Sequence, residues 1–229
     1  MKKYLLTSGR LFLGLFLYAV GIVLTINANL GLSPWDIFHQ GISKHIGITI
    51  GQASITIGIL VLILDWILGE KIGLGTISNM IFVGVFMDIL MLNHLLPVFE
   101  NMISKIIMVL IGMFIIGIAS YFYISAGLGS GPRDGLMIAL TKKTKKSVRF
   151  IRTCIEFSVL IAGYLLGGSI GFGTILMVFG SGYFVQLAFI IFKFDVKEVE
   201  HQFINDYTKL IYSRLESTKK LPESQSIEE

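Results

Sequence analysis

The sequence predicts an all-α polytopic membrane protein with six transmembrane helices, arranged as two inverted three-helix repeats that each carry a short interfacial or re-entrant helix. Of its 229 residues, 54% are hydrophobic and 15% are charged, and the mean hydropathy is +0.77. A soluble domain carries about 25% charged residues, so a lipid bilayer is the better solvent for this chain. The sequence also matches itself at a constant offset of 98 residues, and loops rich in basic residues alternate with loops that have few.

Six apolar runs have the length of a membrane span. The hydrocarbon core of a bilayer is about 30 Å thick and requires roughly 20 apolar residues per helix. The runs are Leu11–Ala28, Ile50–Leu68, Gly75–Leu95, Lys105–Ala126, Phe150–Leu166 and Thr174–Phe192. A secretory signal is the alternative for the first run, but cleavage there would remove the first helix of the repeat.

The basic residues predict the orientation of the chain. They gather at the N-terminus and in the loop between the fourth and fifth runs, whereas the loops around 97–104 and 167–173 have none. The basic residues are Lys2, Lys3 and Arg10 at the N-terminus, and Arg133, Lys142, Lys143, Lys145, Lys146 and Arg149 in the loop. Because cytoplasmic loops carry the excess of Lys and Arg, we expect both termini in the cytoplasm of a bacterial cell. This pattern also explains the net charge of +4 without a nucleic-acid partner.

The repeat divides the chain into a first half, residues 1–98, and a second half, residues 99–195. Small and turn-forming residues match in order along both halves. The pairs include Gly31/Gly129, Pro34/Pro132, Asp36/Asp134, Gly75/Gly173 and Gly84/Gly182. An odd number of spans reverses direction, so the second half should be inverted, as in many secondary transporters. Residues 196–229 remain as a cytoplasmic tail, with an amphipathic helix over Phe194–Ser217 followed by a disordered end.

Each half contains a helix start directly after its first span. Ser33 or Gly131 stands at the N-cap, Pro34 or Pro132 at the first helical position, and an aspartate in the first turn. The helix that follows has about 11 residues, too few to cross the bilayer. Its free N–H groups and positive dipole end favour an anionic ligand. The alternative is a surface helix whose aspartate only completes its own cap.

Ionisable residues within spans are further candidates, because each is costly in lipid. Asp88 has a polar repeat partner in Gln186, while Glu156 follows Arg152 by one helical turn and is alternatively a self-neutralising pair. Asp65 lies near a span end and is expected to snorkel to the surface. The candidate substrate-binding residues are Ser33, Pro34, Asp36, His39, Asp88, Ser130, Gly131, Arg133, Asp134, Glu156 and Gln186. No catalytic, cofactor or metal-binding motif is present, and we expect no enzyme activity.

Two segments carry a resemblance to a known family. The run from Asn29 to Asp36, followed by His39-Gln40-Gly41, and the run from Gly127 to Met137 resemble the YczE/YitT group of bacterial membrane proteins. The resemblance covers about residues 10–192. It implies a plasma-membrane protein of Gram-positive type. It implies neither a substrate nor catalytic residues.

Three functions fit these observations. The first is a permease for a small anionic or zwitterionic solute, with the bilayer and that solute as its partners. The second is a substrate-binding membrane subunit of a larger importer, similar to the S-components of energy-coupling-factor importers. The third is a membrane scaffold or regulator that acts through the tail. A permease should enclose a polar cavity between the halves, whereas a scaffold should leave the same residues paired and dry. A chain this small is also a candidate for a homodimer.

Overall fold

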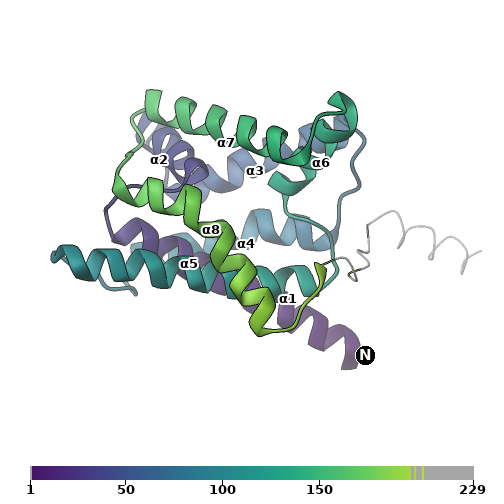
Figure 1. The fold of residues 1–229 in the computed structure, drawn as a ribbon, viewed down its shortest axis with the longest axis horizontal. Helices are drawn as coiled ribbons and strands as arrows, with labels where there is room; N and C mark the ends of the chain where they lie inside the picture. Colours follow the sequence, from purple (N-terminus) through teal and green to yellow (C-terminus); the bar gives the residue numbers. More distant parts are fainter. Residues whose placement is uncertain (1, 197–198, 200–202, 204–229) are drawn as a thin grey trace, which may run out of the picture.

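The computed structural model describes residues 2–196, 199 and 203, and the described residues form eight helices and no strand (Figure 1). The helices are α1 (Lys2–Asn27), α2 (Pro34–Ile46), α3 (Ile50–Ile67), α4 (Leu74–Leu92), α5 (Met102–Ser125), α6 (Pro132–Thr144), α7 (Val148–Leu165) and α8 (Phe172–Ile191). In Figure 1, α5 and α7 follow the long axis of the molecule, and α8 runs obliquely and crosses α5.

Five of these helices, α1, α3, α4, α5 and α8, are long and apolar enough to cross a membrane. Their outer faces carry large apolar side chains, such as Trp66 and Phe179, which are 71% and 73% exposed. Such exposure suits contact with lipid rather than with water. The fifth predicted run, Phe150–Leu166, corresponds to α7, which is not among these five: it is as long as α3 but carries Arg149, Arg152 and Glu156.

The helices recur along the chain at the predicted offset. α2 and α6 are both 13-residue helices whose first residues, Pro34 and Pro132, are 98 residues apart, and α3 and α7 show the same spacing. Ser33 and Gly131 stand at the two N-caps, so the predicted starts of the short helices are confirmed. Proline is suited to the first helical position because its missing N–H would have no partner there.

The loop before each short helix packs on the last helix of the other half. Gly173 N donates a hydrogen bond to the carbonyl of Leu30 at 2.6 Å, and Gly75 N donates one to the carbonyl of Leu128 at 2.7 Å. Gly31 and Gly129, with φ of 104° and 113°, occupy equivalent places in the two loops. A side chain at either would be strained by the backbone conformation and would overlap the opposing helix start.

α2 and α6 point toward opposite ends of the molecule (Figure 1). The Lys44 ammonium near the end of α2 donates to the carbonyl of Gly167, in the loop between α7 and α8, at 2.8 Å. Lys142 near the end of α6 instead binds Glu70, after α3, at 2.8 Å. The first turn of α2 is buried, α6 begins with the buried Pro132, and both helices end in exposed residues, so both run outward from the interior.

The tail helix predicted over 194–217 lies almost wholly outside the described residues. Phe194 and Asp195, at its start, are described and are not helical.

Candidate functional site

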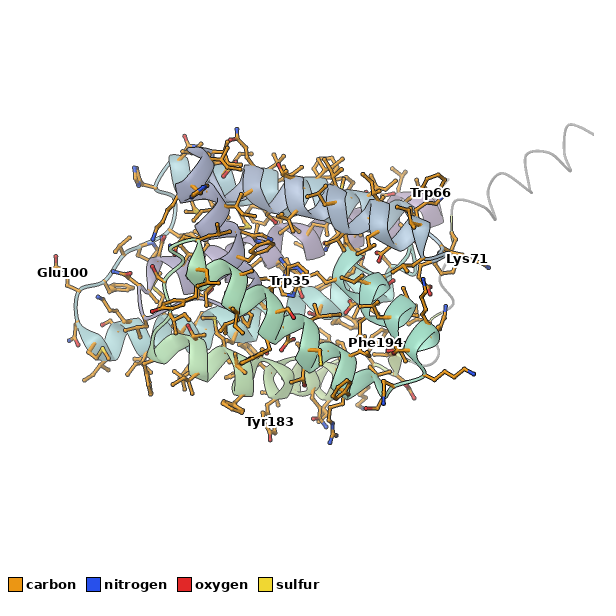
Figure 2. The ribbon with its side chains drawn as sticks, turned by 90° about the horizontal axis from the view of Figure 1, so that it is seen from above. Trp35, Trp66, Lys71, Glu100, Tyr183 and Phe194 are labelled. Carbon is orange, nitrogen blue, oxygen red and sulfur yellow. The ribbon has the colours of Figure 1, made fainter. Side chains whose placement is uncertain are left out.

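A cavity of about 420 Å³ lies between the two halves, and all eight described helices contribute to its wall. Figure 2 labels Trp35, one of its lining residues, near the middle of the molecule. Many lining residues occupy equivalent positions, 98 residues apart. These pairs include Ser33/Gly131, Pro34/Pro132, Trp35/Arg133, Asp36/Asp134, His39/Met137, Ser54/Arg152, Ile57/Ile155 and Gly58/Glu156. The starts of α2 and α6 therefore face one common space.

The start of α2 satisfies its own aspartate. Ser33 Oγ donates to Asp36 Oδ2 at 2.5 Å and accepts from Asp36 N at 3.3 Å. His39 Nδ1 lies 3.7 Å from Asp36 Oδ1, which is too long for a hydrogen bond. Burial alone raises the pKa of Asp36, but His39, the charge of Arg133 and the Ser33 hydroxyl outweigh it and leave that pKa below its usual value. Asp36 is thus an engaged carboxylate.

The start of α6 lacks this arrangement. Gly131 replaces the serine and provides no side-chain cap. Asp134 consequently lines the cavity with its side chain exposed, whereas Asp36 is buried. Desolvation in the cavity raises the pKa of Asp134, and the positive charges of Arg152 and Arg133 oppose that rise. The two equivalent aspartates therefore differ, and only the one on α6 is available to a ligand.

Arg133 connects the two short helices across the cavity. Its guanidinium carbon lies 4.6 Å from the centre of the Trp35 ring, a cation–π contact between equivalent positions. Within the described part of the chain it forms no hydrogen bond and no ion pair. Its guanidinium N–H groups therefore have no acceptor among the described residues.

The Arg152–Glu156 pair lies in the part of the cavity wall that α7 contributes. Arg152 Nε donates to Glu156 Oε1 at 3.0 Å, as the alternative interpretation of these residues expected. Both residues line the cavity, and the glutamate is the more buried of the two side chains. The pair neutralises itself, so Arg133 and Asp134 remain the unpaired charges of the site.

Eight of the eleven predicted site residues line this cavity. They are Ser33, Pro34, Asp36, His39, Gly131, Arg133, Asp134 and Glu156. Ser130 lies beside a second cavity, where its carbonyl accepts from Thr76 Oγ1 at 2.5 Å.

Two candidates lie elsewhere. Asp88 accepts hydrogen bonds from Thr49 Oγ1 at 2.5 Å and Gly51 N at 2.9 Å, so it ties α4 to the start of α3. Gln186 is exposed on α8 and lines neither cavity. The snorkelling expected of Asp65 was also wrong, because this side chain is buried with only 3% of its surface exposed.

Several aromatic and hydroxyl residues of the cavity were not among the candidates. Tyr123 has a buried hydroxyl without a hydrogen-bond partner among the described residues, and Ser120 donates to the carbonyl of Ile116 at 2.8 Å. Tyr18 completes this group on the cavity wall. Trp35 was detectable from the repeat, because it occupies the position equivalent to Arg133.

Comparisons with known proteins place the chain in a family. The family of unknown function DUF6198 matches residues 2–189. The chain is similar to the uncharacterized membrane protein YczE of Bacillus subtilis, with 40% identity over 77% of this chain and 82% of YczE. It is 34% identical to an uncharacterized protein of Haemophilus influenzae, over 79% and 82% of the two chains, and 33% identical to YyaS of Bacillus subtilis, over 72% and 84%. No solved structure matches. The chain is a membrane protein and belongs to the DUF6198 family.

Proposed function

We propose that the protein is a small-solute permease of the bacterial plasma membrane, and that it binds a small organic anion or zwitterion in the central cavity. The observation that carries this proposal is the lining of the cavity by equivalent residues of both halves, including two helix starts and the unpaired Arg133. Binding sites of transporters built from inverted repeats lie at the interface of the repeats, where interrupted helices point their starts at the substrate.

The proposal includes an inverted arrangement of the halves, with α7 as the sixth span. It is supported by the equal lengths of α3 and α7 and by the reciprocal hydrogen bonds that Leu30 and Leu128 accept. It is also supported by the opposite directions of α2 and α6. Arg152 and Glu156 face the cavity as a pair, which lowers the cost of carrying charge on a spanning helix. The basic residues at the end of α6 support a cytoplasmic location for both termini, because cytoplasmic loops carry the excess of Lys and Arg.

The chemistry of the cavity favours a carboxylate. The starts of α2 and α6 present positive dipole ends, and the planar guanidinium group of an arginine matches the two oxygens of a carboxylate. Asp134, which lies next to Arg133, is placed to accept the ammonium group of a zwitterion. A volume of about 420 Å³ suits a small solute. A scaffold has no need for an unpaired arginine in a cavity between its helices, so this observation favours the permease.

Thermal unfolding of the purified full-length protein tests the binding step. We expect one or more small carboxylates or amino acids from a panel to raise its melting temperature, since a ligand of the folded state stabilises it. Arg133→Ala should weaken that ligand by roughly 10- to 150-fold, the loss expected for a hydrogen bond to a charged group. Arg149→Ala is the matched control, because this exposed arginine lies outside the cavity.

Uptake into liposomes that contain only this protein then separates the permease from the importer subunit. A permease takes up the ligand found in the melting assay, and Asp134→Asn should reduce that uptake while the protein remains folded. Binding without uptake would instead identify a subunit that needs a partner. If no panel member changes the melting temperature, or if Arg133→Ala leaves the change intact, the cavity is not an anion site.

A further inference from the structure

Asp65 of α3 is a buried carboxylate that the proposed solute site does not use. Only 3% of its surface is exposed, and its Oδ1 atom has no hydrogen-bond partner among the described residues. Within that part of the chain it also forms no salt bridge. An isolated buried carboxylate is costly when charged, and it avoids that cost by binding a proton.

The repeat shows that packing does not require an acid at this position. The equivalent residue in α7 is Gly163, which packs directly on the backbone of Phe38 in α2. In the corresponding contact between α3 and α6, the glycine belongs to the short helix instead. A Cβ atom at Gly135 of α6 would lie 2.5 Å from Asp65 Oδ2. The small residue is thus on the long helix in the α2–α7 contact and on the short helix in the α3–α6 contact. Only the second of these contacts contains a carboxylate. A role in folding shared by both halves does not account for Asp65.

Asp65 borders a second cavity, of about 210 Å³. The charged groups facing it there are Glu70, Lys71 and Lys142, and the glutamate and Lys142 neutralise each other at 2.8 Å. This cavity lies toward the end of the molecule where Figure 2 labels Lys71. Because this cavity is partly open and Asp65 lines it, water can bring a proton to the buried carboxylate.

α6 connects this carboxylate to the central cavity. Gly131, the N-cap of α6, lines both cavities, and Gly135 lies one turn further along and touches Asp65. A change of charge at Asp65 thus acts on the helix that carries Arg133 and Asp134. Only the first turn of α6 and its N-cap, Gly131, separate Asp65 from the central cavity.

We propose that Asp65 reversibly binds a proton that enters through the second cavity. The proton is taken from water onto a carboxylate oxygen, which gives a neutral acid, and its return to water restores the carboxylate. If the proposed permease function holds, this proton is the coupling ion, and movement of α6 is the step that it controls. Only that assignment rests on the proposed function, because proton binding is measurable without any solute.

Infrared spectroscopy of the full-length protein in lipid bilayers tests the proposal. We expect an acid-minus-alkaline difference spectrum to contain the C=O stretch of a protonated carboxyl group, which shifts on transfer to D₂O because the second cavity reaches solvent. Asp65→Asn should remove this band. Glu70→Gln, which alters the other carboxylate of the same cavity, should retain it.

Gly135→Ala provides a second variant that leaves the acid in place. Its methyl group meets Asp65 Oδ2, so the band should move in frequency without disappearing. A difference spectrum that is the same in wild type, Asp65→Asn and Gly135→Ala would overturn the proposal. Failure of every solute to bind would leave this result unaffected, so the two proposals fail separately.

Discussion

At the residue scale, a single substitution between the halves makes the two aspartates different. Ser33 holds Asp36 through two hydrogen bonds, whereas Gly131 leaves Asp134 open to the cavity. Two further pairs of equivalent positions in the cavity differ in the same way: Trp35 corresponds to Arg133, and Ser54 corresponds to Arg152. The second half thus supplies the unpaired cation and the available carboxylate, and the first half supplies an aromatic wall and an engaged carboxylate. We infer that the charged groups of a solute bind chiefly to the second half.

Ser33→Ala separates the capping role of this residue from its effect on the cavity. Loss of the cap should lower the free energy of unfolding by about 1 kcal/mol. It should also release Asp36 as a second carboxylate in the cavity and weaken anion binding, measured by the ligand-dependent melting temperature. Ser147→Ala is the control, because Ser147 caps α7 at an exposed site by accepting from Phe150 N at 3.3 Å. Equal loss of binding in both variants would contradict this account.

The local chemistry of the site was predictable, but its tertiary contacts were not. The N-cap, proline and aspartate pattern gave the starts of α2 and α6 correctly, because capping depends on neighbouring residues. The role of Asp88 was not predictable, since its partners Thr49 and Gly51 belong to the preceding helix. The contact between Trp35 and Arg133 joins residues far apart in sequence and likewise required the fold.

At the scale of elements, glycines set how closely the helices approach. A Cβ atom at Gly84 would meet the backbone of Gly51. Its repeat partner Gly182 has open space around it, so equivalent glycines do not pack alike. α1 and α5 meet at Gly21 and Gly112, where a Cβ atom on either would lie 2.8 Å from a carbonyl of the other helix. Spacing in the sequence marked the helices correctly but not which of their faces are in contact.

Gly112→Ala and Gly182→Ala form a matched pair that tests this packing. The first places a methyl group against rigid backbone and should lower the free energy of unfolding by about 1–3 kcal/mol. The second meets no atom within 4 Å and should leave stability nearly unchanged. Denaturant unfolding in bicelles measures both. A similar loss in the two variants would show that the α1–α5 contact is not as close as described.

At the scale of the whole molecule, the segments before and after residue 98 are joined at equivalent loops. Cross-half hydrogen bonds from Gly75 and Gly173 tie each loop to the last helix of the other half, and the short helices extend outward in opposite directions from one cavity. The predicted boundaries of the long helices agree with the structure to within about three residues, because the lengths of apolar runs are set by bilayer thickness, except that α1 begins at Lys2 and not at Leu11. The cavity itself was an expectation of the inverted-repeat hypothesis, and its detailed lining came from packing between the halves.

The central claim is that the two halves cross the membrane in opposite directions around one cavity, and labelling of equivalent positions tests it most directly. His45 and Lys143 are 98 residues apart and both exposed, near the ends of α2 and α6. Each is changed to cysteine after Cys154, which is exposed, is replaced by serine. In right-side-out vesicles, an impermeant maleimide should label His45→Cys at once and Lys143→Cys only after permeabilisation. Labelling of both from the same side would contradict the account.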